Sequence, residues 1–357
     1  MLKVDRKKHS AFEDEYAEEA LKVLKGMKGT ETMPLKDTDK LLTFYQKIEA
    51  YGLRDVMGLG SALSNPTEAK LKAFLKNFFL ASPETLKKAH AHLKDSKYRG
   101  CSSDPFLKHF QDNAYSSMCN HTDKNNIRYN IRILRSLDYR VCPYCGCAYV
   151  GGRGDHILGA ELDHFINKKD YPFFALCLYN LVPSCKSCNN HKRKDDDECL
   201  VSPFEEAADF DTNIKIRLYS RPYVQMVKNE YHESRIEVRV TSDEDSDDYK
   251  RYKANVDGFN LQDAYEALES EAVEYVNKMV RYPGTQMKEL EHILAMDLGG
   301  IDEWRLRVEH GHKLEKELFL DQCAEADEQA KKINSKLYTD LYKTYRRPRH
   351  SMDPEQE

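Results

Sequence analysis

The sequence predicts an α+β protein that is predominantly helical, with a small core set between two larger helical regions. Apolar residues recur at helical spacing through most of the first 120 residues and again beyond residue 260. Two segments, 213–220 and 236–241, instead alternate apolar and polar residues, as half-buried strands do. Between the helical regions stand two cysteine pairs with Cys-x-x-Cys spacing, which mark a segment of different chemistry.

The expected helices follow from apolar stripes and from residues that favour helix starts. Thr67, with Pro66 before it and Glu68 in the first turn, begins one helix, and Ser82 begins another. The expected helical ranges are 11–27, 36–51, 67–80, 82–94, 124–140, 261–281, 284–297 and 302–345. The acidic run at 243–248 is expected to be a solvated turn.

Four regions are expected along the 357 residues, whose length alone favours two domains. They are a helical N-terminal region (1–121), a core that holds both cysteine pairs (122–208), a C-terminal region of two strands followed by helices (209–345), and a flexible tail (346–357).

Composition excludes several classes of protein. Charged residues make up 32% of the chain and the mean hydropathy is −0.74, which is typical of a globular protein with a charged surface. No apolar stretch approaches the roughly 18 to 20 residues of a membrane span. The N-terminus has no apolar segment of the kind found in secretory signals. We therefore expect a cytoplasmic protein without a membrane partner. Its ten cysteines are expected to be metal ligands, catalytic groups or buried apolar residues rather than disulfides.

The two cysteine pairs predict a structural zinc site. Cys142 and Cys145 form the first pair, and Cys185 and Cys188 form the second. Four thiolates close a tetrahedral zinc site, and a segment this short needs the folding energy of the metal. A redox role for the first pair is the rival hypothesis, but no βαβ pattern surrounds it. Cys147 is expected to be a spare thiol and Cys177 a core residue.

Four polar residues interleave with these cysteines. Asp163 and His164 stand in Leu-Asp-His-Phe, Asn180 in Tyr-Asn-Leu-Val-Pro, and Asn189 directly after the fourth cysteine. Asp and Asn offer the hard oxygen ligands that Mg²⁺ and Mn²⁺ prefer, and a neutral His is suited to act as a base. Their order and spacing resemble the HNH (ββα-metal) nuclease motif over residues 142–204.

The resemblance implies a small zinc-stabilised ββα-metal nuclease core and a metal-dependent endonuclease that hydrolyses nucleic-acid phosphodiester bonds. It assigns His164 as the general base, Asp163 and Asn189 as ligands of a catalytic Mg²⁺ or Mn²⁺, and Asn180 as the residue that orients His164 through its backbone or ring. Adjacent strand residues point to opposite sides, so Asp163 and His164 need an irregular strand end to converge on one phosphate.

One position departs from the commonest family pattern. Many members carry His where this chain has Asn189, although Asn variants exist. Loss of an imidazole ligand favours Mg²⁺ over zinc or nickel. His191 could substitute as a ligand, but on a helix it points about 200° away from Asn189.

The flanks resemble HNH proteins of bacterial anti-phage systems, including the HNH subunits of Septu defence and of some retrons. The matching residues are Lys168, Lys169, Tyr171-Pro172 and Ser202-Pro203-Phe204. The resemblance implies an ABC-type ATPase partner and a DNA substrate, with RNA or tRNA kept open. The alternative is a zinc-stabilised adaptor that binds nucleic acid or protein and whose nuclease site is inactive.

Charge is distributed unevenly. The net charge of −5 argues against a nucleic-acid binder, yet residues 122–194 carry 12 basic and 6 acidic residues, and the remainder sums to −11. The expected nucleic-acid-binding residues are Arg128, Arg132, Arg135, Lys168, Lys169, Lys192, Arg193 and Lys194. For the three arginines, which share one face of the expected 124–140 helix, a solvated charged face is the alternative.

Overall fold

Several helices begin where a side chain caps the free N–H groups of the first turn. The side chain of Thr67 accepts a hydrogen bond from the backbone N–H of Lys70 at the start of α4 (Glu68–Phe79). Ser82 likewise accepts one from Thr85 at the start of α5 (Pro83–Leu93). Each such cap stabilises its helix by about 1 kcal/mol. Both starts confirm those expected from the sequence.

The computed structural model describes residues 1–27, 37–95, 101–192, 200–219, 234–282 and 329–345, together with residues 319, 321 and 323. The chain forms two compact units. The N-terminal unit comprises Lys3–Tyr144 and Tyr149–Ala208, and the C-terminal unit comprises Met1–Leu2, Cys145–Ala148 and Asp209–Glu357. Most of the two regions expected at 1–121 and 122–208 therefore belongs to one unit.

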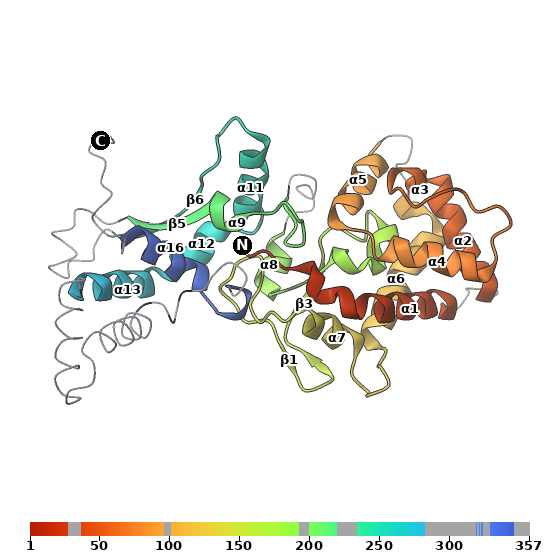
Figure 1. Ribbon diagram of the computed structural model, residues 1–357, viewed down its shortest axis with the longest axis horizontal. Coiled ribbons are helices and arrows are strands. Elements are labelled where there is room, and N and C mark those ends of the chain that lie inside the picture. Colours follow the sequence, from red (N-terminus) through yellow and green to blue (C-terminus); the bar gives the residue numbers. More distant parts are fainter. Residues whose placement is uncertain are drawn as a thin grey trace, which may run out of the picture. The chain divides into compact units, whose positions relative to one another are not determined.

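The N-terminal unit is built mainly from helices, with η denoting a 3-10 helix (Figure 1). Its described helices are η1 (Arg6–His9), α1 (Ser10–Gly26), α2 (Asp37–Ala50), α3 (Leu53–Val56), α4, α5, η3 (Cys101–Ser103), α6 (Pro105–Asn120), α7 (Tyr129–Ser136), η4 (Pro172–Leu176), η5 (Leu178–Asn180) and α8 (Lys186–His191). Its strands are β1 (Gly152–Arg153), β2 (Ile157–Leu158), β3 (Glu161–His164) and β4 (Leu181–Ser184). β1 pairs with β2 and β3 with β4, both antiparallel.

An aromatic cluster forms the core of the N-terminal unit. Phe44 of α2 is fully buried, and its ring centroid lies 4.8 Å from that of Phe110 on α6 and 5.7 Å from that of Phe78 on α4. It also lies 5.9 Å from the ring of Phe173 on η4. Because Phe173 belongs to the segment between β3 and β4, the helices and this segment share one core.

The C-terminal unit combines a two-stranded sheet with helices. Its described elements are α9 (Phe210–Asn213), β5 (Ile214–Tyr219), β6 (Arg235–Val240), α11 (Asp247–Gly258), α12 (Leu261–Glu266), α13 (Glu269–Arg281), η8 (Gln329–Lys331) and α16 (Ser335–Tyr345). β5 and β6 run antiparallel, with Ile214 opposite Val240, and both strands lie where the alternation predicted them. The protein is thus α+β and largely helical, with small antiparallel sheets, as expected.

The helix expected at 124–140 is shorter in the structure, where α7 spans Tyr129–Ser136. Before it, the Asp123 carboxylate accepts hydrogen bonds from the backbone N–H groups of Asn125 and Ile127, which stabilise a turn instead of a helix. Beyond its end, Asp138 has a φ of +50°, outside the right-handed helical region. Arg128 consequently lies at the N-cap of α7 and not within the helix.

The acidic run expected to be only a turn also starts a helix. Ser246 caps α11 by accepting a hydrogen bond from Tyr249, and Asp247 and Asp248 lie in the first turn, where they favour the positive end of the helix dipole. The single helix expected at 261–281 is divided into α12 and α13. The helix expected at 284–297, most of 302–345 and the tail lie outside the described residues. None of the described helices is both long and apolar enough to cross a membrane.

Candidate functional site

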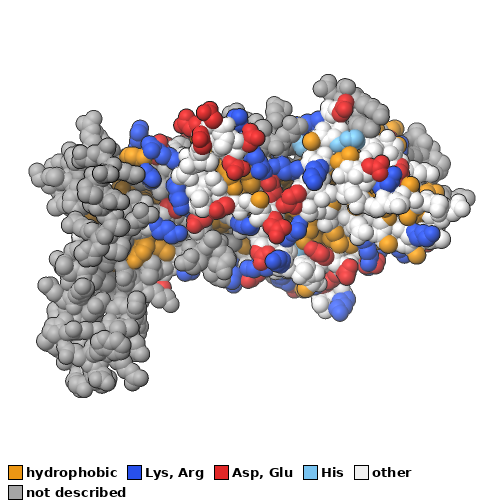
Figure 2. Space-filling model, turned by 45° about the horizontal axis from the view of Figure 1, so that its top comes forward, with side chains coloured by type: hydrophobic (Ala, Val, Ile, Leu, Met, Phe, Trp, Pro, Cys, Tyr) orange, Lys and Arg blue, Asp and Glu red, His pale blue; other side chains and the backbone are white. Residues whose placement is uncertain are grey.

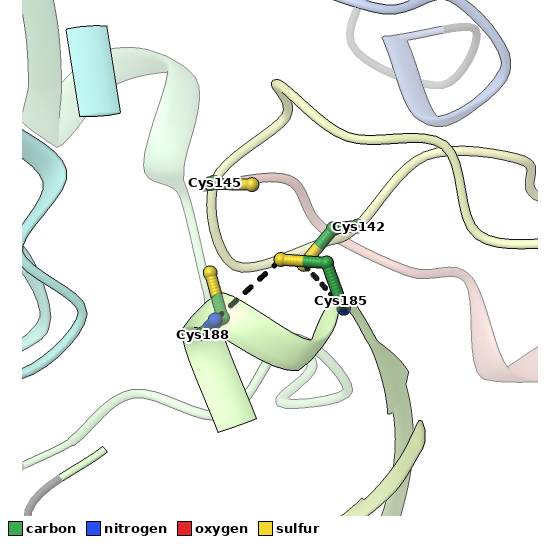
Figure 3. Close-up of side chains that lie close together, drawn as sticks. All are labelled: Cys142, Cys145, Cys185 and Cys188. Carbon is green, nitrogen blue, oxygen red and sulfur yellow. Dashed lines mark hydrogen bonds between the residues drawn. The ribbon is translucent and has the colours of Figure 1, made fainter. Parts of the chain in front are cut away.

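The two cysteine pairs come together in the structure. The sulfur atoms of Cys142, Cys145, Cys185 and Cys188 all lie within 4.8 Å of one another (Figure 3). Three of the four residues are buried. Four thiolates at this spacing could bind a structural metal such as zinc. Within the described residues, no other group of three or more His, Cys, Asp or Glu side chains has metal-binding spacing.

Backbone N–H groups and a glycine turn hold the cysteines of the cluster in place. Cys185 is the N-cap of α8, and its sulfur accepts a hydrogen bond from the backbone N–H of Cys188 at 3.5 Å. The sulfur of Cys142 accepts one from the N–H of Cys185 at 3.4 Å (Figure 3). Gly146, with a φ of +74°, turns the chain after Cys145 in a conformation that favours glycine. Such N–H groups stabilise thiolate charge and therefore favour metal binding.

The other cysteines that the structure describes stay outside this cluster. The thiol of Cys147 donates to the carbonyl oxygen of Cys145 at 3.3 Å, and its sulfur is not a member of the four-sulfur group. Cys177 is fully buried, which confirms the prediction of a core residue.

Asp163, His164 and Asn189 line one cavity of about 880 Å³ in the N-terminal unit. Asp163 and His164 end β3, which pairs with β4, and α8 follows β4 and carries Asn189. The consecutive elements β3, β4 and α8 therefore form a ββα arrangement. Residues 165–176 of the intervening segment include η4, which packs against α6.

A backbone carbonyl orients the His164 ring. Its Nε2 lies 3.1 Å from the carbonyl oxygen of Ala175. Because a carbonyl oxygen only accepts hydrogen bonds, Nε2 carries the hydrogen and Nδ1 keeps its lone pair. Burial, together with the charges of Lys168 and Lys192, lowers the pKa of His164 to about 3. The ring is neutral near pH 7 and available as a proton acceptor.

The two carboxylate oxygens of Asp163 have different environments. Oδ2 accepts a hydrogen bond from the Tyr144 hydroxyl at 2.7 Å and lies 3.2 Å from Nζ of Lys192. Oδ1 accepts no hydrogen bond from the part of the chain that the structure describes. The side chain faces a largely desolvated environment, since Asp163 is 7% exposed.

Asn189 is held through its amide nitrogen. Nδ2 donates a hydrogen bond to Oε2 of Glu161, which also lines the cavity. The amide oxygen of Asn189 therefore remains as the atom able to act as a ligand. Asp163 and Asn189 together offer hard oxygen donors, which fit Mg²⁺ or Mn²⁺ better than a softer metal. His191, the candidate substitute ligand, is exposed and does not line the cavity.

Asn180 stabilises the backbone around the cavity instead of contacting the His164 ring. Its Oδ1 accepts from the N–H of Ile166 at 2.6 Å, and its Nδ2 donates to the carbonyl oxygens of Ile166 and Phe174 at 3.0 and 3.1 Å. Phe174 directly precedes Ala175, whose carbonyl holds His164. Asn180 thus joins the segment after β3 to the segment that orients His164, and it acts on the ring through Ala175.

The expected basic residues divide into two groups. Arg132 is paired with both Asp123 and Glu15, and Arg135 is paired with Asp155. Arg128 donates to the carbonyl oxygen of His156. All three arginines therefore make contacts within the protein, and their expected role in nucleic-acid binding stays a prediction. On the face drawn in Figure 2, basic and acidic side chains are interspersed.

Lysines near the cavity are placed differently. Lys168 and Lys169 line it, and Nζ of Lys168 lies 3.9 Å from the ring centroid of Tyr115. The Tyr115 ring meets the His164 ring edge-on at 4.5 Å. Among the described residues Lys168 forms no ion pair with a carboxylate, and the Tyr115 ring that its Nζ contacts also lines the cavity. Arg193 and Lys194 lie outside the described residues.

Sequence reasoning missed Tyr144, Glu161 and the carbonyl of Ala175. Glu161 could have been found, because it stands two residues before Asp163 and so lies on the same face of the strand. Tyr144 carried only a weak signal, its place between two cysteines. The Ala175 carbonyl had none, since every residue supplies one. Comparisons with protein-family models, curated proteins and solved structures found no match for this chain.

Proposed function

We propose that this chain is a metal-dependent endonuclease of the HNH (ββα-metal) type, which hydrolyses phosphodiester bonds of nucleic acids. The observation that carries the proposal is the convergence of Asp163, His164 and Asn189 on one cavity. These residues come from a ββα arrangement whose α8 starts at the four-cysteine cluster. The cavity, about 880 Å³, is large enough for a segment of sugar and phosphate.

The chemistry follows from the atoms available. Nδ1 of the neutral His164 accepts the proton of an attacking water, while the Ala175 carbonyl keeps the ring oriented. Lys168 attracts the phosphate by its positive charge. A Mg²⁺ or Mn²⁺ ion bound by Asp163 and Asn189 would supply the positive charge that stabilises the developing charge on the phosphate oxygens. Zinc on the four cysteines would have a purely structural role.

The alternative, a zinc-stabilised binding adaptor without nuclease activity, is favoured by one observation. Nζ of Lys192 lies 3.2 Å from Asp163, so a cation of the chain already faces one oxygen of the proposed ligand. The two proposals differ in a measurable way, because an adaptor binds nucleic acid without cutting it and has no need of a neutral His164.

Cleavage by purified full-length protein tests the proposal. Zinc-loaded protein is incubated with plasmid DNA and, separately, with tRNA, in the presence of Mg²⁺, Mn²⁺ or EDTA. We expect cutting that depends on the divalent cation and that falls by at least about 100-fold in His164→Ala, the scale of a lost general base. His156→Ala, a change at an exposed histidine outside the cavity, is the matched control and should cut normally.

Cutting by His164→Ala at the wild-type rate would refute the assignment of the base. The adaptor would be favoured if the wild-type protein binds nucleic acid but does not cut it with any cation tested. This result must also hold in the presence of the ATPase partner proposed below.

We further propose that the chain acts as the effector of an anti-phage complex with an ABC-type ATPase, as in Septu or retron-associated systems. This proposal rests on the flanking residues Lys168, Lys169, Tyr171-Pro172 and Ser202-Pro203-Phe204 and on their resemblance to such proteins. Co-expression with the neighbouring genes tests it. An ATPase that purifies with the chain and changes its cutting rate would support the complex, and cutting that no partner affects would count against it.

A further inference from the structure

A tyrosine that has no assigned role in the nuclease motif contacts the proposed metal ligand Asp163. Tyr144 stands between Cys142 and Cys145 in the sequence, and its ring is fully buried. Its hydroxyl donates a hydrogen bond of 2.7 Å to Oδ2 of Asp163. The segment that supplies two cysteines of the cluster therefore also supplies a donor to the carboxylate in the cavity.

A second donor reaches the same oxygen. Nζ of Lys192 lies 3.2 Å from Oδ2 of Asp163, and it donates to the carbonyl oxygens of His164 and Phe165 at 2.7 and 2.5 Å. The Lys192 side chain is only 6% exposed. Three acceptors saturate its ammonium group, which fixes Lys192 in place and limits rotation of the Asp163 carboxylate.

Two donors on Oδ2 leave the other oxygen of Asp163 for a ligand. Oδ1 accepts no hydrogen bond from the described residues, and Asp163 lines the cavity. A carboxylate that is hydrogen-bonded through one oxygen binds a metal through the other, so it acts as a monodentate ligand of fixed direction. Outer hydrogen-bond partners of this kind commonly change metal affinity by 10-fold to 100-fold.

We propose that Tyr144 is a positioning residue, which together with Lys192 holds Oδ2 of Asp163 so that only Oδ1 is presented to the divalent cation. This inference rests on the proposed function, because it concerns the same metal site. The inference links the cysteine segment to the cavity. The turn that carries Cys142 also places Tyr144, and Tyr144 in turn sets the orientation of the Asp163 carboxylate.

The test is Mn²⁺ binding by zinc-loaded, full-length protein, followed through the electron paramagnetic resonance signal of free Mn²⁺. Wild type is compared with Asp163→Asn to identify the binding that depends on Asp163. For Tyr144→Phe, which removes only the hydroxyl, we expect the dissociation constant of this site to rise about tenfold. Zinc content should stay unchanged, and saturating Mn²⁺ should restore most of the cleavage rate.

Tyr139→Phe is the matched control. Tyr139 is also buried in the N-terminal unit, and its hydroxyl donates to the carbonyl oxygen of Pro183 at 2.9 Å instead of to Asp163. This variant should bind Mn²⁺ with wild-type affinity. An equal loss in both variants would mean that any missing buried hydroxyl weakens the site, and the proposal would be wrong.

Lys192→Arg provides a second route if Tyr144→Phe does not fold. It keeps the positive charge but cannot reproduce the contacts of the ammonium group to three acceptors. We expect weaker Mn²⁺ binding than in Lys186→Arg, a change at the exposed first residue of α8, the helix whose C-cap is Lys192. Unchanged Mn²⁺ affinity in a folded, zinc-loaded Tyr144→Phe or Lys192→Arg protein would overturn the inference about how Asp163 is positioned. The proposed metal site would still stand. Absence of any Asp163-dependent Mn²⁺ binding in wild type overturns the proposed metal site as well.

Discussion

His9, a buried histidine outside the cavity, is expected to make the stability of the N-terminal unit depend on pH. His9 is fully buried among the rings of Phe12, Tyr179 and Phe204, and its Nδ1 lies 2.6 Å from the Ser136 hydroxyl. Burial lowers the pKa of His9 from 6.5 to about 3. Below pH 6.5 the unfolded chain binds a proton that the folded chain does not bind until about pH 3. The contribution of His9 to stability is therefore complete above pH 6.5 and decreases as the pH falls through this window.

We expect His9 to lower the free energy of unfolding by about 1.4 kcal/mol between pH 7.5 and 5.5. His9→Phe retains an aromatic ring in the same cluster but cannot titrate. Urea unfolding at both pH values, measured by circular dichroism, should give a smaller pH dependence for His9→Phe than for wild type, by about that amount. Equal pH dependence in the two proteins would contradict the buried neutral ring.

At the scale of single residues, the sequence predicts which residues form the candidate site better than it predicts how their side chains are oriented and paired. Asp163, His164 and Asn189 could be selected because their residue types and order are specific. The role of Asn180 was predicted only approximately, since its hydrogen bonds to Ile166 and Phe174 depend on how two loops meet. The pairing of Arg132 with Asp123 could not be predicted, because α7 begins at Tyr129, later than the apolar stripe suggests, and Asp123 lies in the turn before it.

At the scale of elements, α8 links the cysteine cluster to the cavity. Cys185 caps this helix with its sulfur, and Asn189 lies one turn later. The order of the motif predicts that these residues are close, because Asn189 follows Cys188 directly. The sequence does not predict the strand register, in which His164 pairs with Leu181, because four-residue strands carry little periodicity.

Cys185→Ser separates the two roles of this residue. Serine is a good N-cap, so α8 keeps its cap but the cluster loses a thiolate. We expect zinc content, measured by plasma mass spectrometry, to fall below half of the wild-type value, and the melting temperature to fall by at least about 5 °C. Cys147→Ser changes a thiol outside the four-sulfur group and should leave both quantities unchanged. Full zinc content in Cys185→Ser would exclude Cys185 as a ligand.

At the scale of the whole molecule, the helices and the ββα arrangement of the N-terminal unit depend on one core. A separate helical region and nuclease core were expected, because the first 120 residues show helical periodicity and the cysteine pairs and motif residues follow them. The contact between Phe44 and Phe173 is between residues far apart in the sequence, so no local pattern could predict it. It places η4, and with it the Ala175 carbonyl that orients His164, on the helical core.

This shared core predicts that a mutation that destabilises the helices also destabilises the elements around the cavity. Phe44→Ala removes a fully buried ring and should destabilise the N-terminal unit by about 3–5 kcal/mol. Because Phe173 loses its partner, hydrogen exchange measured by mass spectrometry should become faster in β3, β4 and η4 as well as in α2 and α4. Tyr149→Ala, at a side chain that is 63% exposed, is the control and should change neither. Faster exchange confined to α2 and α4 would show that the ββα arrangement folds independently, and the expectation of a separate nuclease core would then hold at the level of stability.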